Sequence, residues 1–547
     1  MLRILKKALS RNEGLPQAAR LRAEASFSRG MDAVRGGRFE EALGAFDAAI
    51  ALDPRSVAAH FNRAAALGDL GRSEESASAY DRCIALSPHW ADAHVGLGIA
   101  LTRLKRFKEA RRSLDSALAI EPNAFDALAA RADLTRDEGR YAEAVDLYQQ
   151  LLKAQPDNDR VLNDHGVVLH RLDRFDEALA SFDAALRVRP QQAEALVNRG
   201  LTLTSLGRYD EALASYKSAK RIAPDMAGAH LNEATCELLL GNFERGWRGY
   251  EWRWKSLWWL STQGAHARRS FDKPLWLGNQ TLKRKTIFVH AEQGMGDTLQ
   301  FVRYAKLLAE KGARVLLEVQ APLKMLLEGV EGVSGLTSVG EPVPEHDLHC
   351  PMMSLPLAFG TRLGTIPAAG GYLQIERRHA NVLATWRKRL GPVRAPRVGL
   401  VWSGNPAHPN DAKRSIPFRQ IQTWLSTGLE FHALHSEIRF TDRDAVARDP
   451  RLAVWTSKLR NFVDTAALIA NLDLVVCVDT GVAHLAGAMG KPVWILLPRD
   501  PDWRWLTGRD DSPWYASARL FRQQRAGDWS APIDEIHQRL ESFGRSQ

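Results

Sequence analysis

The stretch that decides the fold of the N-terminal half is residues 207–224, which read GRYDEALASYKSAKRIAP. A Gly-Arg pair opens it, a small residue and an aromatic residue follow at fixed distances, and a proline closes it. The same arrangement recurs upstream, so that prolines lie 34 residues apart at Pro54, Pro88, Pro122, Pro156, Pro190 and Pro224. Six phased copies indicate an internal repeat rather than a chance similarity.

Each conserved place in the repeat has a physical reason. The glycine lets the chain turn between two helices, and a small residue, Ala212 in this copy, allows those helices to approach closely. Tyr216 fills the groove between neighbours, and Pro224 ends the second helix because it cannot donate the next hydrogen bond. The pattern resembles the tetratricopeptide-repeat family over residues 22–256 and predicts an α-solenoid.

A seventh unit lacks the closing proline and ends at residues 243–254 as FERGWRGYEWRW. A terminal repeat is expected to be atypical, because its outer face meets something other than another repeat. We therefore expect the aromatic residues of this segment to form a joint with the next domain, ahead of an aromatic linker at 257–282. These residues are Trp247, Tyr250, Trp252 and Trp254.

A solenoid of this kind binds partners along one face. Asn62, Asn198 and Asn232 occupy the same repeat position, where side-chain amides can bond the backbone of a docked protein or peptide acceptor. This partly resembles the asparagine ladder of the eukaryotic O-linked N-acetylglucosamine transferase. The ladder is interrupted in the other repeats, so an ordinary polar helix surface remains the alternative.

From about residue 283 the 34-residue period ends, and strand-like and helix-like segments alternate. The strand-like segments are residues 286–291, 313–319, 397–402, 429–434, 474–478 and 493–498. This alternation predicts parallel α/β architecture. Two series of such segments indicate two Rossmann-like lobes, at 283–376 and 397–547, joined by a linker at 377–396. In such sheets ligands bind beyond the carboxyl ends of the strands, and three motifs lie there.

The first motif is EQGMGDT at residues 292–298, in which Gly294 and Gly296 let backbone approach a ligand and Asp297 lies at a helix start. An ordinary aspartate helix cap is the alternative. The second motif joins the Ser403-Gly404 loop to Lys413 and Arg414. Adjacent cations suit a diphosphate, whereas a solvated basic loop is the bland interpretation.

The third motif is DTGVAH at residues 479–484, where an apolar strand gives way at once to a helix. The free N–H groups of that helix start favour an anion. Thr480 adds a hydroxyl, Gly481 opens the helix, and Asp479 can accept hydrogen bonds from sugar hydroxyls. A tight strand–helix turn with a core-facing His484 is the alternative.

These motifs, in this order, resemble bacterial heptosyltransferase-like glycosyltransferases, which have the two-lobed glycosyltransferase-B fold. More closely, the chain resembles bacterial proteins that fuse tetratricopeptide repeats to such a domain. The resemblance implies inverting sugar transfer from a nucleotide-sugar co-substrate, with no metal and no other cofactor. It implies that Asp297 is the general base and that the other residues bind the donor. Lys413 or Arg414 neutralises the diphosphate and Asp479 contacts the sugar. The turn that binds the diphosphate is formed by Thr480, Gly481 and His484.

Two features near the C-terminus leave alternatives open. Asp500-Pro-Asp502 has the spacing of a metal-binding DxD motif, although its central proline and tryptophan-rich surroundings argue against that function. The neighbouring aromatic residues are suited either to stacking on a base or sugar or to packing as a seam between lobes. They are Trp503, Trp505, Trp514 and Tyr515.

Composition narrows the function classes further. The net charge of +10 favours acidic partners, but basic residues are spread along the chain and no nucleic-acid-binding motif is present. Four dispersed cysteines indicate a reducing compartment without a structural zinc, and no apolar run is long enough for a membrane helix. We expect a cytoplasmic glycosyltransferase that selects a protein acceptor; the alternative is a repeat scaffold whose α/β half is non-catalytic or senses a nucleotide sugar.

Overall fold

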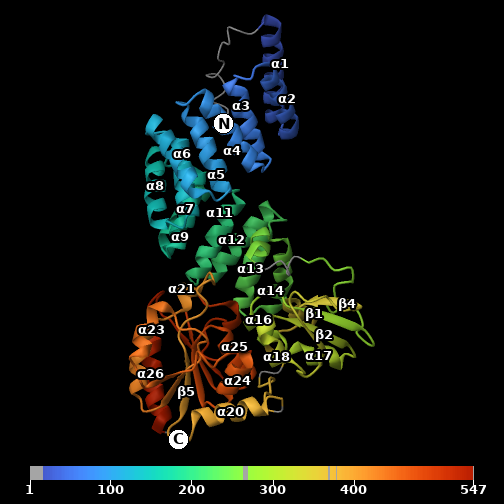
Figure 1. Ribbon diagram of the computed structural model, residues 1–547, viewed down its shortest axis with the longest axis vertical. Coiled ribbons are helices and arrows are strands. Elements are labelled where there is room, and N and C mark those ends of the chain that lie inside the picture. The colour runs from blue at the N-terminus through green and yellow to red at the C-terminus, as the bar shows by residue number, and fades with distance from the viewer. Residues whose placement is uncertain (1–15, 263–268, 368–369, 377, 546–547) are drawn as a thin grey trace. The chain divides into compact units, whose positions relative to one another are not determined.

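The computed structural model describes residues 16–262, 269–367, 370–376 and 378–545 (Figure 1). They form two compact units, residues 1–202 and 203–547, and each unit is considered by itself. Residues 263–268, 368–369 and 377, which fall in the predicted linkers and the first lobe, lie outside the described residues. The predicted domain boundaries stay predictions.

The repeat region consists of alternating first and second helices. The first helices are α1 (Gln17–Arg35), α3 (Val57–Asp69), α5 (Ala91–Arg103), α7 (Phe125–Asp137), α9 (Asp159–Arg171), α11 (Ala193–Ser205) and α13 (Ala227–Leu239). The second helices are α2 (Phe39–Leu52), α4 (Ser73–Leu86), α6 (Phe107–Ile120), α8 (Tyr141–Ala154), α10 (Phe175–Val188), α12 (Tyr209–Ile222) and α14 (Phe243–Tyr250). Each second helix from α2 to α12 ends two residues before a repeat proline, as predicted.

The turn between the two helices of a repeat needs a left-handed residue. Gly71 and Gly139 supply it with φ of 76° and 77°, whereas Lys105 and Asp173 adopt φ of 59° and 58° at the same repeat position. A side chain in this conformation costs about 1–2 kcal/mol. These two turns are therefore held by the packing around them.

Small residues on the first helices make room for large ones on the second. A Cβ atom on Gly98 would lie 2.6 Å from Cγ of Leu114, and one on Gly166 would lie 2.7 Å from Cε1 of Phe182. Both distances are shorter than any ordinary carbon contact, so the close approach of the helices depends on glycine there.

Two parallel sheets follow the repeats. The first has the order β3-β2-β1-β4 and the second the order β10-β9-β8-β5-β6-β7. The first sheet contains β1 (Thr286–His290), β2 (Arg314–Val319), β3 (Val333–Ser338) and β4 (Leu348–Pro351). The second contains β5 (Arg397–Val401), β6 (Glu430–Ala433), β7 (Leu452–Val454), β8 (Leu474–Val478), β9 (Val493–Leu497) and β10 (Ala518–Arg522).

Helices cover the sheets. Around the first lie α16 (Met295–Phe301), α17 (Tyr304–Glu310), α18 (Lys324–Leu327) and α19 (Leu355–Ala358). Around the second lie α20 (Ala380–Leu390), α21 (Asp411–Arg414), α22 (Phe418–Ile421), α23 (Phe440–Ala447), α24 (Phe462–Ala470), α25 (Gly481–Ala488) and α26 (Ser530–Arg545). Short α15 (Leu257–Thr262) follows the last repeat.

The second sheet is buried on both faces. In β8, Val475 and Cys477 join one apolar cluster, while Val476 and Val478 join another that includes Ile536 of α26. Figure 1 shows α23 and α26 on one side of this sheet and α24 and α25 on the other. A parallel sheet between two helical layers is the arrangement expected of a Rossmann-like lobe. The predicted fold class, an α-solenoid followed by two such lobes, is confirmed.

The end of the last repeat belongs to the core of the second unit. Trp247 of α14 is buried and packs edge-on to Trp503 at 5.2 Å and to Phe301 at 6.3 Å between ring centroids. Trp252 differs from the predicted joint, because it stacks on His230 of α13 at 3.7 Å. The joint to the α/β lobes therefore runs through one side of the segment only.

A buried ion pair strengthens that joint. Arg253, which is fully buried, donates to Glu292 of the first lobe at 2.8 Å and to Glu251 at 2.7 Å. Glu292 also accepts a hydrogen bond from the backbone N–H of Met353 at 2.7 Å. A buried charge without a partner is strongly destabilising, so the last repeat and the first lobe depend on each other.

Candidate functional site

The predicted site residues follow the carboxyl ends of β1, β5 and β8, and the segment after β9 lies beside them. The loop after β1 ends at Gly294, and Gly296 and Asp297 lie in the first turn of α16; the loop after β8 carries Asp479 and Thr480. The two lobes touch at Gly296, where a Cβ atom would lie 2.7 Å from Cδ2 of His484 on α25. Glycine at this position lets the first-lobe loop approach the second lobe.

Asp297 has two partners. Its Oδ2 accepts a hydrogen bond from the backbone N–H of Gly294 at 2.8 Å, so it caps α16, and its Oδ1 accepts one from Arg504. Burial raises the pKa of Asp297 above its usual value, and the adjacent Arg504 opposes that rise. The side chain remains 16% exposed, so a bound molecule can still reach it.

Arg504 is the site residue that the sequence analysis missed. It follows β9, is 7% exposed, and also donates to Asp502 at 2.7 Å. Its guanidinium lies 4.2 Å from the ring centre of Trp503. The only sequence signal is an arginine between two tryptophans just beyond a strand, a setting in which arginine commonly stacks and bonds at once.

Arg414 of α21 contacts the residue that precedes the start of α25. Its Nη1 donates to the carbonyl oxygen of Asp479 at 2.8 Å, while its buried Nε has no hydrogen-bond partner among the described residues. A Cβ atom on Gly404 would lie 2.7 Å from Nη2 of Arg414. Lys413, by contrast, is exposed. Arg414 is therefore a cation that contacts the start of α25.

A second arginine holds the Ser403-Gly404 loop in place. Arg439 donates to the carbonyl of Gly404 at 2.8 Å and pairs with the buried carboxylate of Asp411. The hydroxyl of Ser415 donates to Asp411 at 2.9 Å and accepts from the N–H of Gly404 at 3.0 Å. Ser403 itself is buried. This network fixes the backbone against which Arg414 lies.

The start of α25 carries a buried hydroxyl that has no hydrogen-bond partner among the described residues. Thr480 is its N-cap, yet its side chain makes no capping hydrogen bond, and its buried Oγ1 has no partner among the residues that the structure describes. Beside it, burial and then Asp502 raise the pKa of Asp479 to about 6, against the opposing effect of Arg414. A polar ligand at Thr480 and Arg414 would satisfy buried groups that are costly to leave unpaired.

His484 is a packing residue in this arrangement. It is 6% exposed, bonds the hydroxyl of Tyr515 through Nδ1 at 2.9 Å, and stacks on Trp505 at 5.3 Å. Burial and then the nearby Arg504 lower the pKa of His484 to about 3. The imidazole is therefore neutral near pH 7, and its contribution is to hold the two lobes together at Gly296.

The tryptophan cluster and the DxD sequence can now be placed. Trp503, Trp505, Trp514 and Tyr515 are all buried and pack against one another as a seam rather than as an open stacking surface. Asp500 accepts a hydrogen bond from Ser205 at 3.0 Å, and Asp502 pairs with Arg504. Within the described residues, no three acidic, histidine or cysteine side chains are grouped as a metal site requires.

The three predicted docking asparagines do not share one arrangement. Asn62 donates to the carbonyl of Ala58 on its own helix at 2.8 Å, and Asn198 donates to Asn163 at 3.0 Å. Asn232 lies on α13, in the second unit. Their assignment to acceptor docking stays a prediction.

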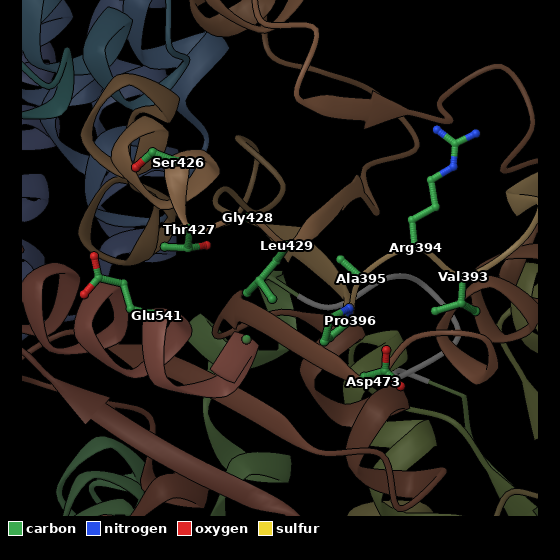
Figure 2. A pocket seen from close by; sticks show the side chains of 11 residues that line it. Val393, Arg394, Ala395, Pro396, Ser426, Thr427, Gly428, Leu429, Asp473 and Glu541 are labelled. Carbon is green, nitrogen blue, oxygen red and sulfur yellow. The ribbon is translucent and has the colours of Figure 1, made fainter. Parts of the chain in front are cut away.

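A separate hollow of about 680 Å³ lies at the amino ends of strands in the second sheet (Figure 2). It is lined by residues that precede strands β5, β6 and β8, including Pro396, Leu429 and Asp473. Asp473 is engaged there in bonding the backbone N–H of Arg397 at 2.8 Å. None of the predicted site residues lines this hollow, and it lies at the amino ends of the strands, away from the motif loops.

Comparison with known families matches two parts of the chain. The tetratricopeptide-repeat model matches residues 27–89, 64–125, 95–159, 129–187 and 163–227. The model for glycosyltransferase family 9 (heptosyltransferase) matches residues 458–501, which contain the DTG motif. The chain therefore carries tetratricopeptide repeats and, at residues 458–501, a segment similar to the heptosyltransferase family of glycosyltransferases.

The individual proteins that resemble this chain share less than a quarter of the aligned residues with it. Protein FlbA of Caulobacter vibrioides is 24% identical over 302 residues, which cover 50% of this chain and 48% of that protein. The chain thus spans about half the length of this relative. A tetratricopeptide-repeat protein from Parabacteroides merdae is 18% identical over 39% of this chain and 83% of its own, with a TM-score of 0.35. YrrB, a repeat protein with an unusual peptide-binding site, is 23% identical over 34% of this chain and 95% of its own, with a TM-score of 0.28.

Within the part of the chain that the structure describes, no helix is both long enough and apolar enough to cross a membrane. The four cysteines are buried and free.

Proposed function

We propose that the protein transfers a sugar from a nucleotide-sugar donor to an acceptor, and that this acceptor is a protein docked on the repeats. The observation that carries this proposal is that the two lobes meet where Gly296, next to Asp297, lies against His484 of α25, and that Arg414 and Thr480 lie at the start of the same helix. A base, a cation and unpaired donors stand there around a site of the kind that α/β sheets use for ligands.

In the proposed reaction the acceptor hydroxyl attacks the anomeric carbon of the donor sugar, and its proton passes to Asp297. The bond from that carbon to the phosphate oxygen breaks, so that a nucleoside diphosphate leaves and the configuration at the carbon inverts. For Asp297 to accept the proton it must be ionised. Arg504 favours that state, because it opposes the effect of burial on the carboxyl pKa.

The departing diphosphate carries charge that must be stabilised. Arg414, the Thr480 hydroxyl and the N–H groups at the start of α25 supply such stabilisation without a metal ion. Their pairing to the donor is supported by two buried atoms that lack hydrogen-bond partners among the described residues. One is Oγ1 of Thr480, and the other is Nε of Arg414, which lies 3.8 Å from Oδ1 of Asp411. Asp479, next to them, is suited to accept from sugar hydroxyls.

The proposal is tested by measuring nucleoside diphosphate release from a panel of nucleotide sugars, with and without candidate acceptor proteins. We expect Asp297→Asn to lower turnover at least about 100-fold with little change in donor affinity, because base catalysis contributes about 10²–10⁴. Arg414→Ala is expected to weaken donor binding. Asp444→Asn, a change at an exposed position on α23, serves as the control. Full turnover in Asp297→Asn would remove Asp297 from this role.

The ion pair between Asp297 and Arg504 favours one alternative, a repeat scaffold whose α/β half binds a nucleotide sugar without turning it over. A carboxylate held by arginine is a weaker base than a free one. The two functions separate in the same experiment, since a sensor raises its melting temperature with a donor by mass action but releases no diphosphate with any acceptor.

A further inference from the structure

A hollow of about 660 Å³ is lined by residues of the first five repeats, within the first unit. Its lining comes from equivalent positions of successive first helices, so that Ala58, Asp92 and Asp126 share one repeat position. Figure 1 shows these helices, α3, α5 and α7, in succession along the repeat region. We call this hollow the repeat groove. Its repetition along the helices suits an extended chain rather than a compact small molecule.

Aromatic rings form one wall of the repeat groove. Phe61 stacks on Trp90 with ring centres 4.6 Å apart, and Tyr80 meets Phe61 edge-on at 5.5 Å. A Cβ atom at Gly96 would lie 2.3 Å from Cζ of Tyr80, so the glycine leaves room for the ring. Trp90 and Phe61 are only half-buried. Exposed aromatic faces of this kind attract aliphatic groups and cations.

The charges around this wall are mostly negative. Asp69, Asp92 and Asp126 line the groove and form no ion pair with any residue that the structure describes. Asp92 lies directly beside the aromatic wall, because its Oδ2 accepts a hydrogen bond from Nε1 of Trp90 at 3.1 Å. Asp69 and Asp92 both lie close enough to Tyr80 to help raise the pKa of its hydroxyl, behind the larger effect of burial.

The two cations of the lining are already neutralised. Arg35 pairs with Asp32, and Arg160 pairs with Asp133 at 2.5 Å and with Asp164 at 3.5 Å. What remains uncompensated is a set of carboxylates next to aromatic faces. That combination is complementary to ammonium and guanidinium groups, which gain both from the charge and from the ring quadrupole.

We propose that the repeat groove binds an extended segment of a partner protein in which lysine or arginine side chains alternate with aliphatic residues, with one cationic side chain lying on Trp90 beside Asp92 and a second near Asp69. Aliphatic side chains then fill the apolar part of the lining near Phe61. As a description of the acceptor, this inference rests on the proposed function. Binding itself requires no sugar transfer.

The test is a titration of the full chain with two fluorescent heptapeptides, acetyl-GLKVKLG-amide and acetyl-GLEVELG-amide, followed by anisotropy. The net charge of +10 favours the acidic peptide, so a preference for the lysine peptide can only arise locally. We expect the lysine peptide to bind more tightly, and Asp69→Asn and Asp92→Asn each to weaken it about 2- to 5-fold. Trp90→Leu should weaken it as well, since leucine keeps the apolar contact but removes the ring.

Asp157→Asn, an exposed carboxylate outside the groove, is the matched control and should leave binding unchanged. Equal binding of both peptides would overturn the inference. So would unchanged binding in the Asp69→Asn/Asp92→Asn double variant with wild-type circular dichroism and unfolding, or an equal loss in Asp157→Asn. If the lysine peptide binds but no donor releases diphosphate, the groove stands and the proposed function falls; the reverse result removes the groove alone.

Discussion

Replacing Arg504 with alanine should destabilise the second unit in a pH-dependent way. The change leaves the mostly buried carboxylate of Asp297 with one hydrogen bond, from the N–H of Gly294, but without its cation. Removing one partner of a fully buried pair costs 3–5 kcal/mol, and the side chains here are 9% and 16% exposed. We therefore expect a loss of about 3 kcal/mol near pH 8. Asp502 adds little to this cost, since its side chain is 36% exposed.

The pH dependence follows from the direction of the carboxyl pKa. Burial already raises the pKa of Asp297, and without Arg504 nothing of comparable strength opposes that rise. A group whose pKa is raised on folding is stabilising when protonated, and this contribution is lost as the pH rises through the folded-state pKa. The difference between Arg504→Ala and wild type should therefore be smaller at pH 5 than at pH 8.

Urea unfolding followed by tryptophan fluorescence measures this difference, because Trp503 lies against Arg504. The double variant Asp297→Asn/Arg504→Ala should be more stable at pH 8 than Arg504→Ala alone, since it strands no charge. Arg419→Ala, an exposed arginine, is the control. A loss that is equal at both pH values, together with a double variant no more stable than the single one, would refute the reasoning.

Three further outcomes follow from the packing. Gly296→Ala should destabilise the lobe contact by about 1–3 kcal/mol in thermal unfolding, because its Cβ would lie 2.7 Å from His484; Gly228→Ala, with open space around it, should not. Lys105→Gly should stabilise the repeats by about 0.5–1 kcal/mol in urea unfolding, since φ there is 59°. Trp247→Ala should cost about 3–5 kcal/mol in unfolding of the second unit, whereas an unchanged midpoint would show that α14 does not share its core.

The sequence predicted the interior strands well and the edge strands not at all. All six predicted strands, such as β5 and β8, have a neighbour on each side, and residues along them are buried on both faces. The four strands that were missed are the four sheet edges, β3, β4, β7 and β10. An edge strand such as β3 is only half-buried, so it lacks the continuous apolar run that reveals a buried parallel strand.

The candidate site was predictable in its motifs but not in its pairings. Asp297 and Thr480 were singled out because glycine-containing turns after strands have a recognisable pattern, and Arg414 because it is one of two adjacent cations. Arg504 was not found, because its role depends on a partner 207 residues away in the chain. For His484 and Asp297 the sequence left two interpretations each. The structure shows that Asp297 caps α16 and that His484 is buried against Tyr515, and their roles toward donor and acceptor stay predictions.

The joint formed by Trp247 and the Arg253–Glu292 pair limits where chains of this kind can gain or lose residues. It makes the seventh repeat a fixed part of the α/β lobes, so a cut placed at the end of the repeats would strip a buried ring and a buried charge from the lobe that remains. Upstream, each repeat is a self-similar unit of 34 residues that contacts its neighbours. The number of those units can therefore grow or shrink by whole repeats, while the contacts between the seventh repeat and the α/β lobes stay unchanged.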